Sequence, residues 1–238
     1  MIRRAAGSPV GRRLGAMLSG MLVCAGTRAA EPAAAPSAWP TNAPLELVGP
    51  GIFKLGKVRL DKPRRTISFP ATVNQTAGAI EYLIVTSYGK THESLLRTDT
   101  EPYHIHLALL LLGVKGAGTN SFPADNAQPL PGDKIAIELS WETNGTEQRH
   151  RAEDFVLNLQ TQSKMSRGAW VYNGSAVSQN KFLAQEIGSI ASVMEDPDAL
   201  INNPRPGREN DKIWQVSPGG LPPLNAELRV TIKLLEDR

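Results

Sequence analysis

The 238-residue chain has very little cysteine: Cys24 is its single thiol. It lies within an N-terminal segment that has the pattern of a removable signal peptide. Without that segment the chain can form no disulfide and can supply no cysteine ligand to zinc or to an iron–sulfur cluster. The fold must therefore rest on apolar burial, which a domain of roughly 190 residues can provide.

The chain also has no apolar run of the about 20 residues that a helix needs to cross a bilayer. The nearest to such a run is the apolar segment at residues 14–26. Four arginines, Arg3, Arg4, Arg12 and Arg13, precede this segment, and the small residues Thr27 and Ala29 follow it. This order is typical of a secretory signal peptide, residues 1–29, cleaved after Ala29. We expect an exported protein, periplasmic or extracellular, with no transmembrane span after cleavage.

Lipid attachment is a second possibility for the N-terminal segment, because Cys24 lies inside it. A lipoprotein signal requires a small residue directly before the cysteine, and Val23 occupies that place. The sequence therefore disfavours lipidation.

An excess of positive charge is lacking once the signal peptide is removed. The whole chain has 26 basic and 23 acidic residues, but five arginines and no acid lie in residues 1–29. The mature chain then carries a formal charge of about −2, so no global basic field supports nucleic-acid binding.

Signatures of common nucleotide and hydrolase sites are missing as well. The chain has no Gly-x-Gly-x-x-Gly sequence, and residues 89–91 lack the earlier glycine of a phosphate loop, because Ile84 stands there. Ser94 lies near His92 but outside a Gly-x-Ser-x-Gly turn, which does not favour a serine nucleophile.

The remaining sequence divides into a Pro/Ala-rich linker, residues 30–50, and one domain, residues 51–238. Apolar alternation predicts strands at 79–88 and 226–235, and a hairpin at 134–151 around Asn144-Gly145. Residues 182–193 also look like a strand, whereas 103–112 follow Pro102 and predict a helix that is apolar on nearly all sides and hence buried. We predict an α+β fold: a largely antiparallel sheet with this buried helix and short additional helices.

Polar residues gather on the strand predicted at 79–88 and in the turn that follows it. Glu81 lies on the strand, and Lys90, His92 and Glu93 lie in the turn, where they could bind an anion or a metal ion. The alternative is a solvated corner in which Lys90 pairs with Glu93.

A second candidate segment is the loop at 196–208, which is rich in carboxylates, amides and prolines. It contributes Asn202, Asn203 and Arg205 to the candidate ligand site. The alternative is a rigid loop whose Asn and Asp side chains cap its own backbone.

A divalent metal site is a further possibility, because His104 could lie against the turn that holds His92. The candidate ligands are His92, His104, Glu93, Asp196 and Asp198. On a helix His104 and His106 diverge, so the two do not form a joint site.

The strings at 78–85 and 89–96, together with 104–113, 170–175 and the loop at 196–208, resemble the YdjY-domain family of exported bacterial proteins. The resemblance covers about three quarters of the mature chain and implies no established activity. An iron–sulfur role attached to some proteins of this name is not compatible with a mature chain that lacks cysteine.

These observations lead to three functional expectations. The first is an exported binding or accessory domain whose partner is an unknown ligand or an envelope protein. The second is a metal-assisted hydrolase that uses the His92, His104 and Glu93 region, and the third is a structural envelope protein.

Overall fold

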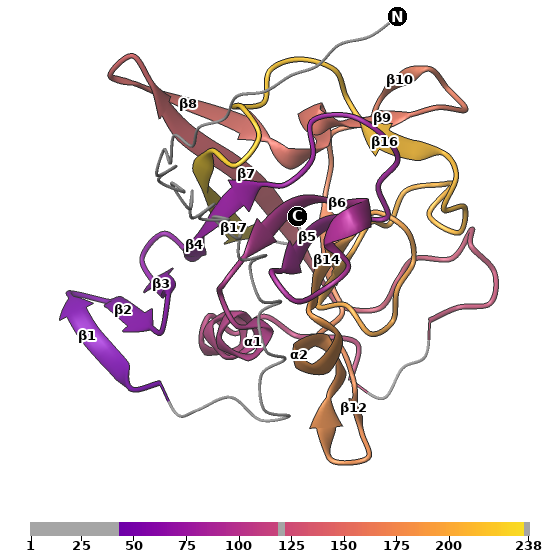
Figure 1. Ribbon diagram of the computed structural model, residues 1–238. Helices are drawn as coiled ribbons and strands as arrows, with labels where there is room; N and C mark the ends of the chain where they lie inside the picture. Colours follow the sequence, from indigo (N-terminus) through magenta and orange to yellow (C-terminus); the bar gives the residue numbers. More distant parts are fainter. Residues whose placement is uncertain (1–42, 119–121, 236–238) are drawn as a thin grey trace, which may run out of the picture. The chain divides into compact units, whose positions relative to one another are not determined.

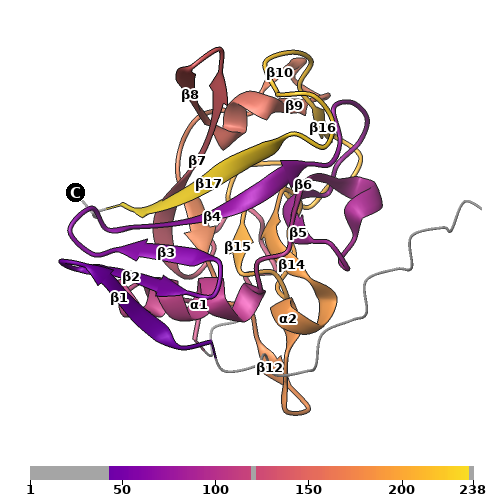
Figure 2. The same ribbon diagram turned by 60° about the vertical axis from the view of Figure 1, so that its left-hand side comes forward.

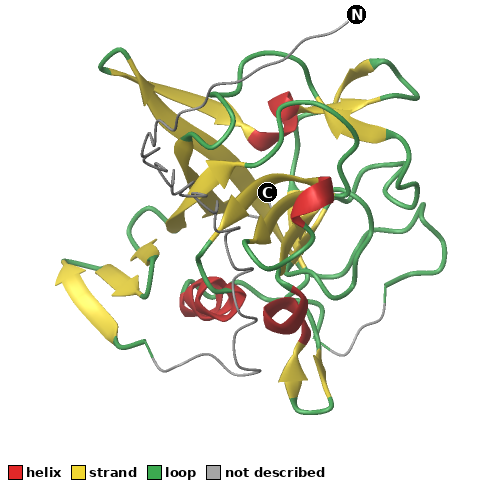
Figure 3. Cartoon of the chain, viewed as in Figure 1, coloured by secondary structure: helices red, strands yellow, loops and turns green. Residues whose placement is uncertain are grey.

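The computed structural model describes residues 43–118 and 122–235. The predicted signal peptide, its Cys24 and most of the predicted linker lie outside the described residues. The fold is mostly β, with 41% strand and 12% helix, so the predicted α+β class is wrong. Figure 3 shows how far strands outnumber helices.

Eight strands close into a barrel (Figures 1 and 2). In order around the ring they are β4 (Thr66–Val73), β17 (Glu227–Leu234), β7 (Asp133–Thr143), β11 (Trp170–Tyr172), β15 (Ile201–Asn202), β14 (Ser189–Ser192), β5 (Tyr82–Thr86) and β6 (Ser94–Thr98). The ring closes where β6 pairs with β4, through Thr72 opposite Arg97 and Val73 opposite Leu96. Most pairs are antiparallel, but β5–β6 and β14–β15 are parallel.

Alternation of apolar and polar residues places one face of the long strands inside the barrel. Along β4 the buried positions include Ile67 and Phe69, and along β17 they include Val230 and Ile232. These side chains belong to one continuous core. The strand predicted at 226–235 is confirmed as β17, which lies between β4 and β7.

The predicted hairpin at 134–151 is also confirmed. Strand β7 pairs with β8 (Thr146–Arg151) from Glu138 opposite Arg151 to Thr143 opposite Thr146. Asn144 and Gly145 connect them with φ of 52° and 73°, as a tight two-residue turn with positive φ at both positions requires.

A three-stranded extension joins the barrel at β4. It consists of β1 (Leu45–Gly49), β2 (Ile52–Leu55) and β3 (Val58–Asp61), so the last residues of the predicted linker form a strand. One smaller sheet consists of β10 (Ser163–Lys164), β9 (Val156–Asn158) and β16 (Trp214–Val216), and another of β12 (Val177–Ser178) and β13 (Lys181–Phe182). The described residues also form two short 3-10 helices, η1 (Thr91–Glu93) and η2 (Ala152–Phe155).

The α-helices among the described residues are α1 (Pro102–Leu111) and α2 (Leu183–Ile187), which lie next to each other in Figures 1 and 2. Ile105 and Leu109 of α1 are buried, but Leu110 and Leu111 are 45% and 41% exposed. The predicted buried core helix at 103–112 is therefore wrong in its placement, because the barrel encloses its own core and α1 covers it from one side only. No helix in the described ranges is long and apolar enough to span a bilayer.

Candidate functional site

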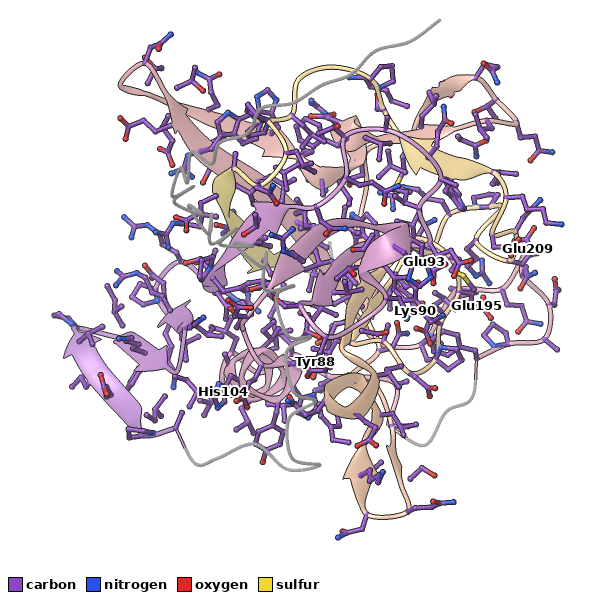
Figure 4. The ribbon with its side chains drawn as sticks, viewed as in Figure 1. Tyr88, Lys90, Glu93, His104, Glu195 and Glu209 are labelled. Atoms are coloured by element: carbon purple, nitrogen blue, oxygen red, sulfur yellow. The ribbon has the colours of Figure 1, made fainter. Side chains whose placement is uncertain are left out.

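The parallel pairing of β5 with β6 positions the polar turn that the sequence singled out. Tyr82 lies opposite Ser94, and the Glu81 backbone N–H donates to the Glu93 carbonyl oxygen at 2.9 Å. Glu81 and Glu93 therefore emerge side by side, one before β5 and one before β6. Lys90 directly precedes the 3-10 helix η1, and its ammonium group lies within 4 Å of both carboxylates. Figure 4 shows Lys90 beside Glu93.

Lys90 is the centre of this arrangement. Its ammonium nitrogen lies 3.4 Å from a Glu93 carboxylate oxygen and 3.9 Å from one of Glu81, and it donates to the Tyr82 hydroxyl at 3.2 Å. Partial burial opposes the charge on Lys90, but the hydrogen bond to Tyr82 and the attraction of Glu93 outweigh it, so its pKa is raised. The side chain is still 50% exposed, which leaves it open to a ligand.

The two carboxyl groups repel each other. Burial raises the pKa of Glu81, the neighbouring Glu93 raises it further, and attraction to Lys90 opposes both effects. Asp211 adds another negative charge at longer range. Glu81 therefore keeps its proton to a higher pH than an ordinary glutamate does.

Tyr82 connects this turn to the loop at 196–208. Its hydroxyl donates to the Asp196 carboxylate at 3.0 Å, and burial, followed by the charge of Asp196, raises the pKa of Tyr82 to about 12. Asp196 in turn accepts the backbone N–H of Asp198 at 2.9 Å. We call Glu81, Tyr82, Lys90, Glu93 and Asp196 the Lys90 cluster.

The predicted ligand residues of the loop are placed differently from Asp196. Asn202 and Asn203 are fully buried, and Arg205 is 9% exposed. Asn202 accepts the Asp196 N–H at 2.7 Å, Asn203 donates to the Val193 carbonyl at 2.9 Å, and Arg205 donates to Glu153, to Asn203 and to the Ser166 carbonyl. These three side chains hold the loop in shape, whereas the Asp196 carboxylate belongs to the Lys90 cluster through its hydrogen bond with Tyr82.

Arg208 is a second arginine of this loop with a structural role, which the sequence did not indicate. It is 2% exposed, pairs with Glu195 at 2.7 Å, and donates to the carbonyls of Asn126 and Gln128. The spacing between Glu195 and Arg208 does not predict their ion pair, because the pair forms only when the loop folds back on itself.

The five candidate metal ligands do not meet at one point. His92 is 78% exposed and 3.6 Å from Glu93, while His104 lies in α1, 3.9 Å from Glu101 and directly beneath Gly56. Figure 4 shows His104 well separated from Lys90 and Glu93. Within residues 43–118 and 122–235, no group of three His, Cys, Asp or Glu side chains could hold a metal ion.

Comparison with protein families matches residues 58–233 to the YdjY domain. The match begins at the first residue of β3 and ends one residue before the end of β17, so it includes every strand of the barrel. No curated protein and no solved structure matches the chain.

Proposed function

The chain belongs to the YdjY domain family, and we propose that it is an exported binding or accessory domain that recognises a ligand with a cationic amine at the Lys90 cluster. The observation that carries the proposal is the imbalance of charge in that cluster. The cluster holds three carboxyl groups and the single ammonium of Lys90: Glu93 and Glu81 lie 3.4 and 3.9 Å from that ammonium, and Asp196 accepts a hydrogen bond from the Tyr82 hydroxyl. A ligand cation would therefore find uncompensated negative charge there.

The proton balance of Glu81 supports the same proposal. Its pKa is raised by burial and by repulsion from Glu93, and a bound cation would reduce that repulsion. Binding of an amine would then release a proton, and affinity would rise with pH through the range in which Glu81 ionises.

The exported location rests on the signal-peptide pattern of residues 1–29. Expression of the full chain in a bacterium, followed by cell fractionation and N-terminal sequencing, tests it. A mature protein that begins at Ala30 outside the cytoplasm supports export, and an uncleaved cytoplasmic protein contradicts it.

The binding role is tested by nuclear magnetic resonance on isotope-labelled mature protein titrated with 1,4-diaminobutane. Succinate has the same number of carbons and the opposite charge, so it serves as the control ligand. We expect the diamine, and not succinate, to shift the backbone signals of residues 81, 90–93 and 196.

The double variant Glu81→Gln/Glu93→Gln should weaken diamine binding at least about tenfold, because it removes two of the attracting charges. Glu142→Gln/Glu147→Gln, which neutralises two exposed glutamates on the β7–β8 hairpin, is the charge-matched control. Absence of diamine binding, or equal binding by both variants, would reject the proposal in favour of a structural envelope role.

A further inference from the structure

The outer face of β3, β4, β17 and β7 carries a polar groove that shares no residue with the Lys90 cluster. Figure 2 shows these strands side by side. Their register aligns one row of outward-facing residues across the four strands: Arg59, Ser68, Thr231 and Glu138. Two residues further along each strand, Asp61, Thr66 and Lys233 form the next row.

These rows line a groove of about 720 Å³, within the size range of ordinary small-molecule sites. Its lining includes the hydroxyl side chains of Thr66, Ser68 and Thr231 together with four cations and two acids: Arg59, Arg64, Arg149, Lys233, Asp61 and Glu138. The groove therefore combines a net positive charge with hydrogen-bonding hydroxyls.

Two of the four cations are already neutralised. Arg64 pairs with Asp61 at 3.0 Å, and Arg149 pairs with Glu147 at 2.9 Å. The side chains of Arg59 and Lys233, by contrast, are exposed and form no hydrogen bond or ion pair with another residue that the structure describes, although Arg59 is near enough to Asp61 to lower the pKa of that carboxyl group. They are free to bind an anionic ligand.

The positions of these two cations constrain the ligand. Arg59 lies on β3 and Lys233 on β17, with β4 between them, and Lys233 is one row further along, so two strand spacings and a two-residue offset put their backbones about 12 Å apart. A ligand with several separated negative charges suits this arrangement better than a compact anion does.

We propose that this groove binds a short acidic oligosaccharide, with carboxylates on successive sugar rings. Arg59 and Lys233 would each bind a carboxylate, since guanidinium and ammonium groups form strong charge-assisted hydrogen bonds with such groups. The hydroxyls of Thr66, Ser68 and Thr231 can both donate to and accept from sugar hydroxyls, and Glu138 can accept from them. None of the described residues that line the groove is aromatic, so they offer an uncharged sugar no ring on which to stack.

The test measures binding of trigalacturonate to the mature protein by isothermal titration calorimetry at low and high salt. We expect binding that weakens as salt rises, and that falls at least about tenfold in Arg59→Gln/Lys233→Gln. Lys164→Gln/Lys212→Gln, which removes two exposed positive charges outside the groove, should change the affinity less than about twofold. Circular dichroism of each variant shows whether its fold is retained.

Two further ligands identify what the groove recognises. Maltotriose has sugar rings without charge, and tripolyphosphate has charge without sugar rings. Equal or tighter binding of either, no binding of trigalacturonate, or equal binding by the double variant and the wild type would overturn the proposal. Because the diamine test uses a different site, either proposal can fail while the other stands.

Discussion

Arg205 and Glu153 form a buried ion pair between residues that lie far apart in the sequence. The guanidinium nitrogen is 3.0 Å from the carboxylate oxygen, and the two side chains are 10% and 0% exposed. The same carboxylate accepts two hydrogen bonds from Arg151 and one from the Gly168 backbone N–H. Glu153 thus joins the β8 end of the hairpin to the loop at 196–208.

Glu153→Gln should lower the free energy of unfolding by about 3 kcal/mol, because it leaves two arginines without their buried counter-charge. Guanidinium denaturation followed by circular dichroism measures the change. Glu147→Gln removes the exposed partner of Arg149 and should cost less than about 1 kcal/mol. Similar losses of unfolding free energy in both variants would show that the buried ion pair stabilises the fold no more than the exposed one does.

Asn202→Ala should cost about 2 kcal/mol, because the Asn202 amide makes three hydrogen bonds and is fully buried. Two of these bonds hold the backbone of Asp196, so the backbone signals of Asp196 should also shift. Asn210→Ala is the control, since Asn210 is exposed and accepts one bond, from the Lys212 N–H. An unchanged Asp196 environment would contradict the role that we assign to Asn202.

His106 should make stability depend on pH. Burial lowers its pKa from 6.5 to about 4, and its Nδ1 lies 2.6 Å from the Tyr172 hydroxyl. Between pH 6.5 and about pH 4, His106 therefore binds a proton in the unfolded chain but not in the folded one. The stabilisation is therefore complete above pH 6.5 and is lost as pH falls toward 4, by up to about 3 kcal/mol.

Urea denaturation at pH 7, 5.5 and 4.5 tests this dependence. In His106→Gln the free energy of unfolding should fall less steeply with decreasing pH than in the wild type. His92→Gln, at a histidine that is 78% exposed, should follow the wild-type curve. Parallel curves for wild type and His106→Gln would contradict the prediction.

Gly188→Ala should destabilise the protein more than Gly113→Ala does. Both glycines have positive φ, 75° and 84°, so both substitutions carry the cost of a left-handed alanine, about 1 kcal/mol. At Gly188 the new methyl group would also overlap the buried Thr86 hydroxyl, whereas at Gly113 nothing lies within 4 Å. We expect an additional loss of about 2 kcal/mol at Gly188, measured by thermal or chemical denaturation, and equal losses would refute the steric argument.

Local patterns predicted local structure well. The hairpin at 134–151 and strand β17 follow from alternation and from Asn144-Gly145, which are properties of neighbouring residues. Closure of the barrel depends on β4 pairing with β6 and on parallel pairs such as β14–β15, which no local pattern encodes. Within the segment predicted as a strand at 182–193, residues Leu183–Ile187 form α2 and Ser189–Ser192 form β14.

The candidate site was predictable only in part, for the same reason. Glu81, Lys90 and Glu93 are close in sequence, and their proximity in space follows from the tight connection of β5 to β6. Extended backbone would point His92 and Glu93 to opposite faces, but η1 makes the turn irregular and brings the two within 3.6 Å. The burial of Asn202 and Asn203 arises from long-range packing, and the sequence could not distinguish these structural amides from ligand-binding ones.

The position of β17 sets the order in which the molecule can be built. Residues 227–234 fill the gap between β4 and β7, two strands that precede them by far in the chain. A growing polypeptide can form the β7–β8 hairpin early, but its barrel stays open, with two unpaired strand edges, until this late segment arrives. Closure of the barrel therefore waits until residues 227–234 have been synthesised and can pair with both strands.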